Sequence, residues 1–259
     1  MAKGMTDSKH YQNIAHAIRE VSDYEGPIAP AQMADRIRVG GQAANQIGRQ
    51  EEYDHFWDAF QQNGTRATYH GAFNTGWTAE IFRPKYNIAT TGCADMFKNF
   101  LYGVESASLK QLLTATGVSL TFHRCGNFGN LFLSANITEI GELDFSTVTR
   151  TNTQNIFNGC RVLKTVDKII LPPGQTTFTG WFNNCTALEN VEFAGTINAN
   201  DFDIHWSTQL THDSLMSIIG CLADRSEQTA YTVTLGTENL AKLTDAEKAM
   251  ATQKGWTLA

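Results

Sequence analysis

NGCRVLKTVDKIILPPGQTTFTGWFNNCTALENVEF, residues 158–193, contains nearly the same phrase twice. Together with Phe157, the stretch gives Phe-Asn-Gly-Cys at 157–160 and Phe-Asn-Asn-Cys at 182–185, 25 residues later. Leu163 and Val166 return as Leu188 and Val191 at the same spacing. Self-similarity at a fixed period of roughly 20–50 residues is typical of folds in which each repeat stacks on the next.

The repeat extends toward the N-terminus. The spaced apolar residues Ile137, Ile140 and Leu143 match Leu163, Val166 and Ile169 at an offset of 26, and Phe132 precedes Phe157 by 25. Leu120 and Phe122 resemble Leu143 and Phe145 at an offset of 23. We therefore read three repeats and a fainter one before them, over about 90–205. Their period lies in the leucine-rich-repeat range of roughly 20–29 residues.

A single repeat buries too little apolar surface to offset its ordering entropy, so stacked repeats must share a core. We expect the recurring asparagine to bond to the backbone at a bend, and the recurring cysteine to act as a small buried hydrophobe. The predicted core positions are Phe132, Ile137, Ile140, Leu143, Phe157, Cys160, Leu163, Val166, Phe182, Cys185, Leu188 and Val191.

The flanks of the repeats have different patterns. At the C-terminal side, 210–222 has helical spacing, 231–235 alternates like a strand, and Thr244 to Glu247 forms a capping box that opens a helix ending before Gly255. Trp256 and Leu258 then predict a last strand. At the N-terminal side, three short amphipathic helices are expected within 1–63, as a small bundle or as a docking or oligomerising segment.

The fold class predicted is α+β: a leucine-rich-repeat-like β-solenoid with an α/β C-terminal cap, preceded by short N-terminal helices. We divide the chain into an N-terminal helical attachment or oligomerisation module (1–63), an aromatic-rich linker and N-cap (64–89), the solenoid (90–205) and the C-terminal cap (206–259).

Composition disfavours several function classes. The formal net charge of −6 argues against nucleic acid and anionic membranes as partners. No run of 18 apolar residues occurs, so we expect no membrane insertion. The polar start of the chain lacks a signal-peptide pattern, which predicts synthesis in a cytosol and exit, if any, by another route. The five cysteines form no CxxC pair and predict neither disulfides nor a zinc site.

Three short motifs hold residue types used in catalysis. Asp201-Phe-Asp203 matches a DxD metal motif, 212–214 holds the letters of a catalytic triad, and 139–144 holds three carboxylates. A polar turn, a helix start and solvated strand residues explain them more simply. We therefore predict no catalytic residue, no metal and no cofactor, and we do not expect an enzyme.

Aromatic residues are the better candidates for binding. Trp206 follows His205 at the junction of the repeats and the cap, where it either seals the junction or stacks on a sugar or a protein. Trp181 lies in the register of Ile156, which favours core packing, but it stays a binding candidate. The predicted binding residues are thus Trp206, His205 and Trp181.

Two resemblances become specific at this point. The segments FNNCTALENVEF, LTHDSLMSIIGCLAD and LTDAEKAMATQKGWTL resemble BspA-type leucine-rich-repeat proteins of phages, prophages and mobile elements of gut Gram-positive bacteria, over about 90–259. The segment YQNIAHAIREVSDYEGPIAPAQMADRIR resembles a helical module of minor tail proteins of siphophage-like phages, over about 10–90. The chain departs from the first family at CGNFGNLFLSAN, where a Phe-x-Asn-Cys phrase is expected, so the repeat count stays open.

The resemblances imply a non-enzymatic, tail-associated structural or adhesion protein of the virion, made in the bacterial cytoplasm and released by lysis. Its repeats would bind a bacterial surface protein or glycan. Its N-terminal helices would join it to other tail proteins or to its own copies. The alternative is a soluble mobile-element effector or inhibitor that binds a host protein in the cytosol.

Overall fold

The computed structural model describes residues 67–68, 72–73, 77–80, 82–85, 87–123, 126–148, 153–175 and 177–259. All of them belong to the second of two units into which the chain divides, Phe60–Ala259. The helices expected within 1–63 and much of the segment 64–89 lie outside the described residues.

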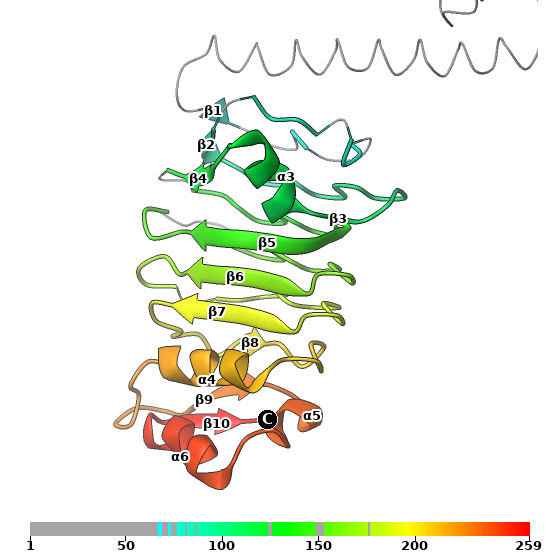
Figure 1. The fold of residues 1–259 in the computed structure, drawn as a ribbon. Coiled ribbons are helices and arrows are strands. Elements are labelled where there is room, and N and C mark those ends of the chain that lie inside the picture. The colour runs from blue at the N-terminus through cyan, green and yellow to red at the C-terminus, as the bar shows by residue number, and fades with distance from the viewer. Residues whose placement is uncertain are drawn as a thin grey trace, which may run out of the picture. The chain divides into compact units, whose positions relative to one another are not determined.

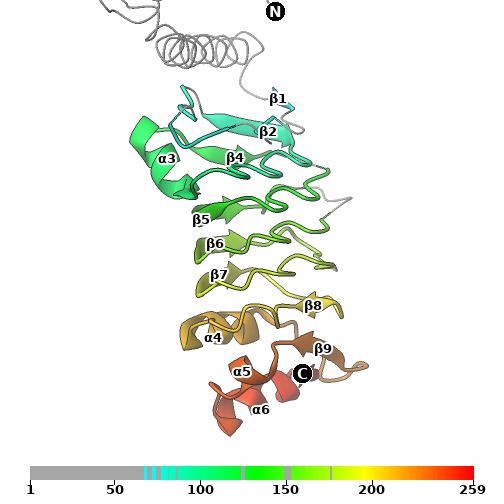
Figure 2. The same cartoon turned by 90° about the vertical axis from the view of Figure 1, so that its right-hand side faces the viewer.

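The described part of the chain mixes helices with parallel strands (Figure 1). Its largest sheet has the order β3-β5-β6-β7, and the strands of each pair run parallel. The strands are β3 (Ala107–Ser108), β5 (Ile137–Asp144), β6 (Thr165–Ile170) and β7 (Asn190–Ala194). Strands β5, β6 and β7 follow one another in sequence and in space, so each is joined to the next by a return of the chain behind the sheet (Figure 2).

Two smaller parallel sheets lie at the two ends of the described region. The first has the order β1-β2-β4 and the second the order β10-β9-β8. Their strands are β1 (Ala67–Thr68), β2 (Ile88–Gly92), β4 (Leu120–Phe122), β8 (Phe202–Asp203), β9 (Tyr231–Thr234) and β10 (Trp256–Leu258). The helices are α3 (Leu109–Thr116), α4 (His212–Cys221), α5 (Thr237–Leu240) and α6 (Asp245–Gln253).

The register of the large sheet follows the sequence repeat. Ile140 pairs with Val166, and Val166 pairs with Val191, which places one apolar residue of each repeat at the same level. The twelve predicted core residues all lie in the interior, each with 3% or less of its surface exposed. Burial of this set at a common level is the physical reason that the three strands align.

A column of four phenylalanine rings runs through the interior. Phe97, Phe132, Phe157 and Phe182 stack with ring centroids 5.2, 5.6 and 5.4 Å apart and interplanar angles of 15°, 4° and 17°. The first ring of the column, Phe97, was not predicted from the sequence. Aromatic contacts of this kind add about 0.5–1.5 kcal/mol each beyond the burial of their area.

Left-handed backbone brackets each ring of the column. Asp95, Asn130, Asn155 and Gly180 have positive φ two residues before the ring, and Asn99, Ser134, Gly159 and Asn184 have positive φ two residues after it. The side-chain amide of Asn155 donates to Asn130 Oδ1 at 3.1 Å, and the side-chain amide of Asn130 donates to Asp95 Oδ1 at 3.1 Å. The asparagine of the Phe-Asn-x-Cys phrase is a different residue, for which we expect a bond to the backbone; at Asn158 the side-chain amide instead donates to Asn155 Oδ1 at 3.2 Å. Asparagine and glycine tolerate this backbone region with little strain.

The repeated cysteines serve as packing groups. Cys160 and Cys185 are fully buried, and their thiols donate to the carbonyls of Phe132 and Phe157 at 2.9 and 3.1 Å. Burial raises the pKa of the Cys160 thiol to about 12 and that of the Cys185 thiol well above its usual range. Thiols of this kind stay protonated and unreactive at neutral pH.

Helices α3 and α4 flank the strands β5–β7 at opposite ends (Figure 1). Helix α3 begins after its N-cap Ser108 and ends at Gly117, and its existence was not predicted. Helix α4 covers the outer edge of β7: Ser214 Oγ accepts from the backbone N–H of Val191 at 2.9 Å, and Ser217 Oγ accepts from that of Phe193 at 2.7 Å. The two hydroxyls replace the backbone partners that a further strand would offer.

The C-terminal elements agree with the sequence. The predicted helix at 210–222 is α4, the strand at 231–235 is β9, and the last strand is β10. Helix α6 opens with the predicted capping box, in which Thr244 Oγ1 accepts from the N–H of Glu247, and the carboxylate of Glu247 accepts from the N–H of Thr244.

Candidate functional site

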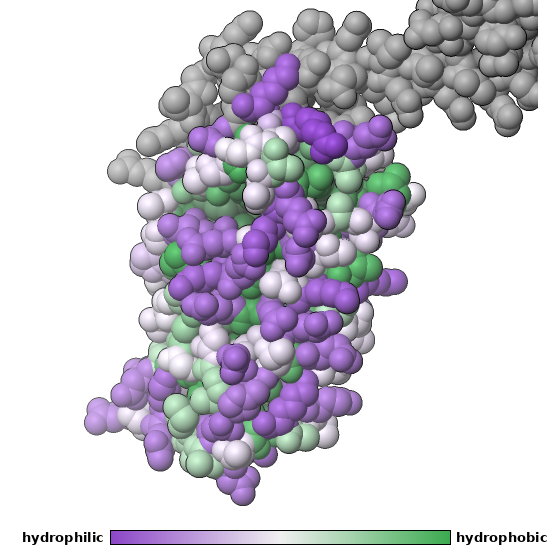
Figure 3. All heavy atoms as spheres, in the orientation of Figure 1, coloured by the Kyte–Doolittle hydropathy of each residue, from purple (hydrophilic) through white to green (hydrophobic). Residues whose placement is uncertain are grey.

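The outward face of β5, β6 and β7 carries polar side chains that differ between strands. At one level Glu139, Thr165 and Asn190 lie side by side. At the next level Glu142 pairs with Lys168, whose ammonium lies 2.7 Å from Glu192. Figure 3 shows mainly hydrophilic residues on this face of the unit. The inward positions are nearly uniform, so the outward positions are where the repeats differ.

One lysine reaches this face from helix α3. The Lys110 side chain runs beside Gly141 of β5, and its ammonium lies 2.8 Å from Asp167 on β6. The bond and the charge of Asp167 raise the pKa of Lys110 above its ordinary value. Because both groups are solvent-exposed, we regard the pair as a means of orienting Lys110 rather than as a source of stability.

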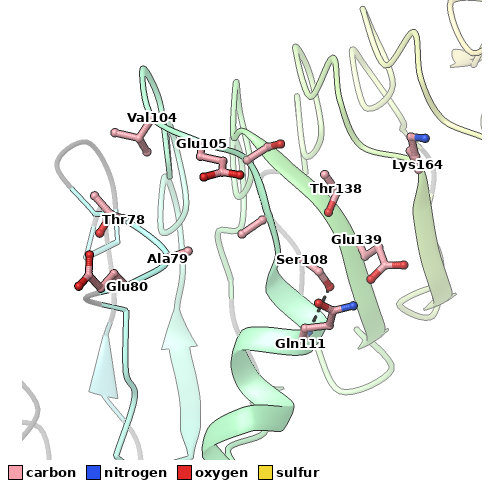
Figure 4. A pocket seen from close by; sticks show the side chains of 12 residues that line it. Thr78, Ala79, Glu80, Val104, Glu105, Ser108, Gln111, Thr138, Glu139 and Lys164 are labelled. Atoms are coloured by element: carbon pink, nitrogen blue, oxygen red, sulfur yellow. Dashed lines mark hydrogen bonds between the residues drawn. The ribbon is translucent and has the colours of Figure 1, made fainter.

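Hollows lie beside both flanking helices. The larger, of about 900 Å³, is lined by the start of α3, the N-terminal ends of β5 and β6, and two loops (Figure 4). Its lining includes Glu80, Glu105, Glu139 and Lys164. A second hollow of about 430 Å³ lies between β6, β7 and the first turns of α4. Together with the strand face, the hollows form a polar surface bounded by a helix at each end.

A separate aromatic corner follows β8. Trp206 is 43% exposed, and its ring centroid lies 5.0 Å from that of His205 at an interplanar angle of 36°. Asp203 Oδ1 accepts from the backbone N–H of His205 at 3.1 Å and lies 2.6 Å from His205 Nδ1. The structure therefore brings together two of the three predicted binding residues and leaves the indole accessible.

Trp181 does not belong to this corner, and we remove it from the binding candidates. Its side chain is fully buried against Phe178 and Phe182, and its indole N–H donates to the carbonyl of Thr153. A ring that packs in the core and has its polar atom bonded offers nothing to a partner.

Residues of the motifs considered for catalysis make contacts that hold neighbouring segments together. The carboxylate of Asp201 accepts from the backbone N–H of Phe178 and from the hydroxyls of Thr177 and Thr179, which ties it to the preceding repeat. His212 lies at the start of α4 and is 2.8 Å from Glu247. Within the residues that the structure describes, no three His, Cys, Asp or Glu side chains lie together as metal ligands would.

The hollow beside α3 was not predicted from the sequence. Its lining includes Gln111 on α3 and Ser108 directly before it. Helix α3 interrupts the repeat, and only the N-cap Ser108 and Gly117 mark its ends locally. Among the helices of the described ranges, none combines the length and the apolar character needed to cross a bilayer.

No family model, curated protein or solved structure matches this chain.

Proposed function

We propose that the chain is a non-enzymatic binding protein built as a leucine-rich-repeat-type solenoid of the BspA kind, and that it acts as a tail-associated structural or adhesion protein of a phage or prophage. Its repeats bind a bacterial surface protein or glycan. The observation that carries the proposal is a difference between the two faces of the strands. The inward residues are nearly the same in each repeat and fill the interior, whereas the outward residues vary from strand to strand.

The parallel register supports the fold part of the proposal. Strands β5, β6 and β7 pair at offsets of 24 to 26 residues, and one phenylalanine of each repeat stacks on the next. A scaffold of this type holds a row of variable side chains at fixed spacing, which is how repeat proteins present binding surfaces.

The tail assignment rests on the resemblance of 10–90 to tail-protein modules. Attachment through 1–63 to other tail proteins, or to further copies of the chain, would bring several solenoids to one cell surface. Several weak contacts made together bind far more tightly than one.

Binding of the labelled full chain to cells of the host tests the function. We expect saturable binding that drops when Glu142, Lys168 and Glu192 on the strand face are changed together to Ala. A matched triple variant at Glu238, Asp245 and Lys248 on the C-terminal helices also removes two acids and one base, and should bind as the parent chain does. Equal binding by the parent chain and both variants would show that the strand face is not the surface that binds cells.

The alternative is a mobile-element effector or inhibitor that binds a host protein in the cytosol. A pull-down from host cytosol with the full chain distinguishes it. One host protein captured in stoichiometric amount, together with no binding to intact cells, would favour the effector.

A further inference from the structure

The backbone on either side of Trp206 is firmly anchored. On one side, both the N–H and Nδ1 of His205 meet the same oxygen of Asp203. On the other side, Ser207 is fully buried, its hydroxyl donates to the carbonyl of Cys185 at 3.1 Å, and its own carbonyl accepts from Asn239 Nδ2 at 3.0 Å. The Trp206 ring is thus carried by a segment with little freedom to fold it away.

Gly236, the residue directly before helix α5, packs closely against His205. Gly236 has φ of +84°, and a Cβ at this position would lie only 3.1 Å from Cβ of His205. Glycine permits both the backbone conformation and the close approach. Gly236 therefore packs against His205 on one side, and Asp203 contacts the Nδ1 atom of its imidazole. These two contacts fix the orientation of the ring.

Trp206 differs from the other tryptophans of the described ranges. Trp77, Trp181 and Trp256 have 6% or less of their surface exposed, whereas Trp206 is 43% exposed. A large ring left in water forgoes the stabilisation that burial would bring. The indole N–H of Trp206 has no hydrogen-bond partner among the described residues, so the ring offers both an apolar face and a donor.

We propose that Trp206, His205 and Asp203 form a saccharide-binding site, which specifies the glycan arm of the proposed function and rests on it. The apolar face of a pyranose ring stacks on the indole of Trp206. Its hydroxyl groups bond to His205 Nε2 and to the second carboxylate oxygen of Asp203, which meet no partner among the described residues.

The polar neighbours favour a sugar over an apolar protein anchor. An aromatic anchor in a protein interface works best where its surroundings are desolvated and apolar. Here the ring lies beside an imidazole and a carboxylate with side-chain exposures of 40% and 38%, held at fixed positions by their mutual bond. Oriented polar groups beside an exposed ring suit a ligand that has an apolar face and a rim of hydroxyls.

Tryptophan fluorescence of the full chain tests the site. The probes are the methyl glycosides of glucose, galactose, rhamnose and N-acetylglucosamine. We expect a saturable change with at least one, no change in Trp206→Ala, and binding weaker by about tenfold in His205→Ala. Tyr102→Ala is the matched control, because Tyr102 is an aromatic residue exposed by 64% elsewhere, and it should bind as the parent does. Equal thermal midpoints for the variants would show that the fold is kept.

Cell binding separates this proposal from the broader one. If the sugars bind but the chain does not bind cells, the site stands and the adhesion proposal fails. If the chain binds cells, and Trp206→Ala binds them equally with no competition by the sugars, the saccharide site is overturned and adhesion survives. If Trp206→Ala loses cell binding while no sugar binds or competes, the corner is a protein contact and the saccharide proposal is again overturned.

Discussion

At the scale of single residues, the repeat depends on side chains that touch their own counterparts in the next repeat. Phe157 packs face to face between Phe132 and Phe182. Asn155 bonds to Asn130 beside the same column. Because each contact joins like to like, a change at one position affects the repeats on both sides of it.

Glycine 180 tests the tightness of that column. A Cβ on Gly180 would collide with Oδ1 of Asn155, whereas Gly174 also has positive φ but has open space around it. We expect Gly174→Ala to lower the free energy of unfolding by about 1 kcal/mol through backbone strain. We expect Gly180→Ala to lower it by about 1–3 kcal/mol more, because Asn155 must move. Chemical denaturation followed by circular dichroism measures both free energies of unfolding. Equal losses in the two variants would show that Asn155 can move without cost.

At the scale of elements, the large sheet is ended by a helix that supplies hydroxyls to the edge of β7. Ser217→Ala leaves the N–H of Phe193 without its acceptor, and Phe193 is buried. We expect a loss of about 1–3 kcal/mol in the free energy of unfolding. Amide hydrogen exchange at Phe193 should also become faster. Thr252→Ala, on the exposed side of α6, should change stability by no more than about 0.5 kcal/mol. Unaltered exchange at Phe193 in Ser217→Ala would contradict the proposed edge cover.

The start of α6 predicts a dependence on pH. Bonds from the backbone N–H and the hydroxyl of Thr244, followed by His212, lower the pKa of Glu247. A carboxyl whose folded pKa lies below its unfolded value stabilises the fold above the unfolded value, and loses that effect as pH falls through the folded pKa. We expect Glu247→Gln to be less stable than the parent at neutral pH, and the difference to vanish in acid. Thermal midpoints across that range measure it, and a difference independent of pH would contradict the assignment.

At the scale of the whole molecule, the parts predicted well were those with local signals. Helix α6 and strand β10 follow from a capping box and a tryptophan after a glycine, and the alignment of β5–β7 follows from the repeat period. Phe97 was missed because it lies 35 residues before Phe132, a spacing lengthened by the insertion of α3. The exposure of Trp206 depends on how the cap packs against the last repeat, and no local pattern records that.

The measurement that tests the central claim most directly is made on purified particles. We would release particles from an induced culture that encodes the chain, identify their proteins by mass spectrometry, and label the same particles with gold-conjugated antibody against the chain. The proposed function requires the chain in the particles and gold at the tail. A chain that is abundant in the soluble lysate but missing from the particles would contradict the tail assignment.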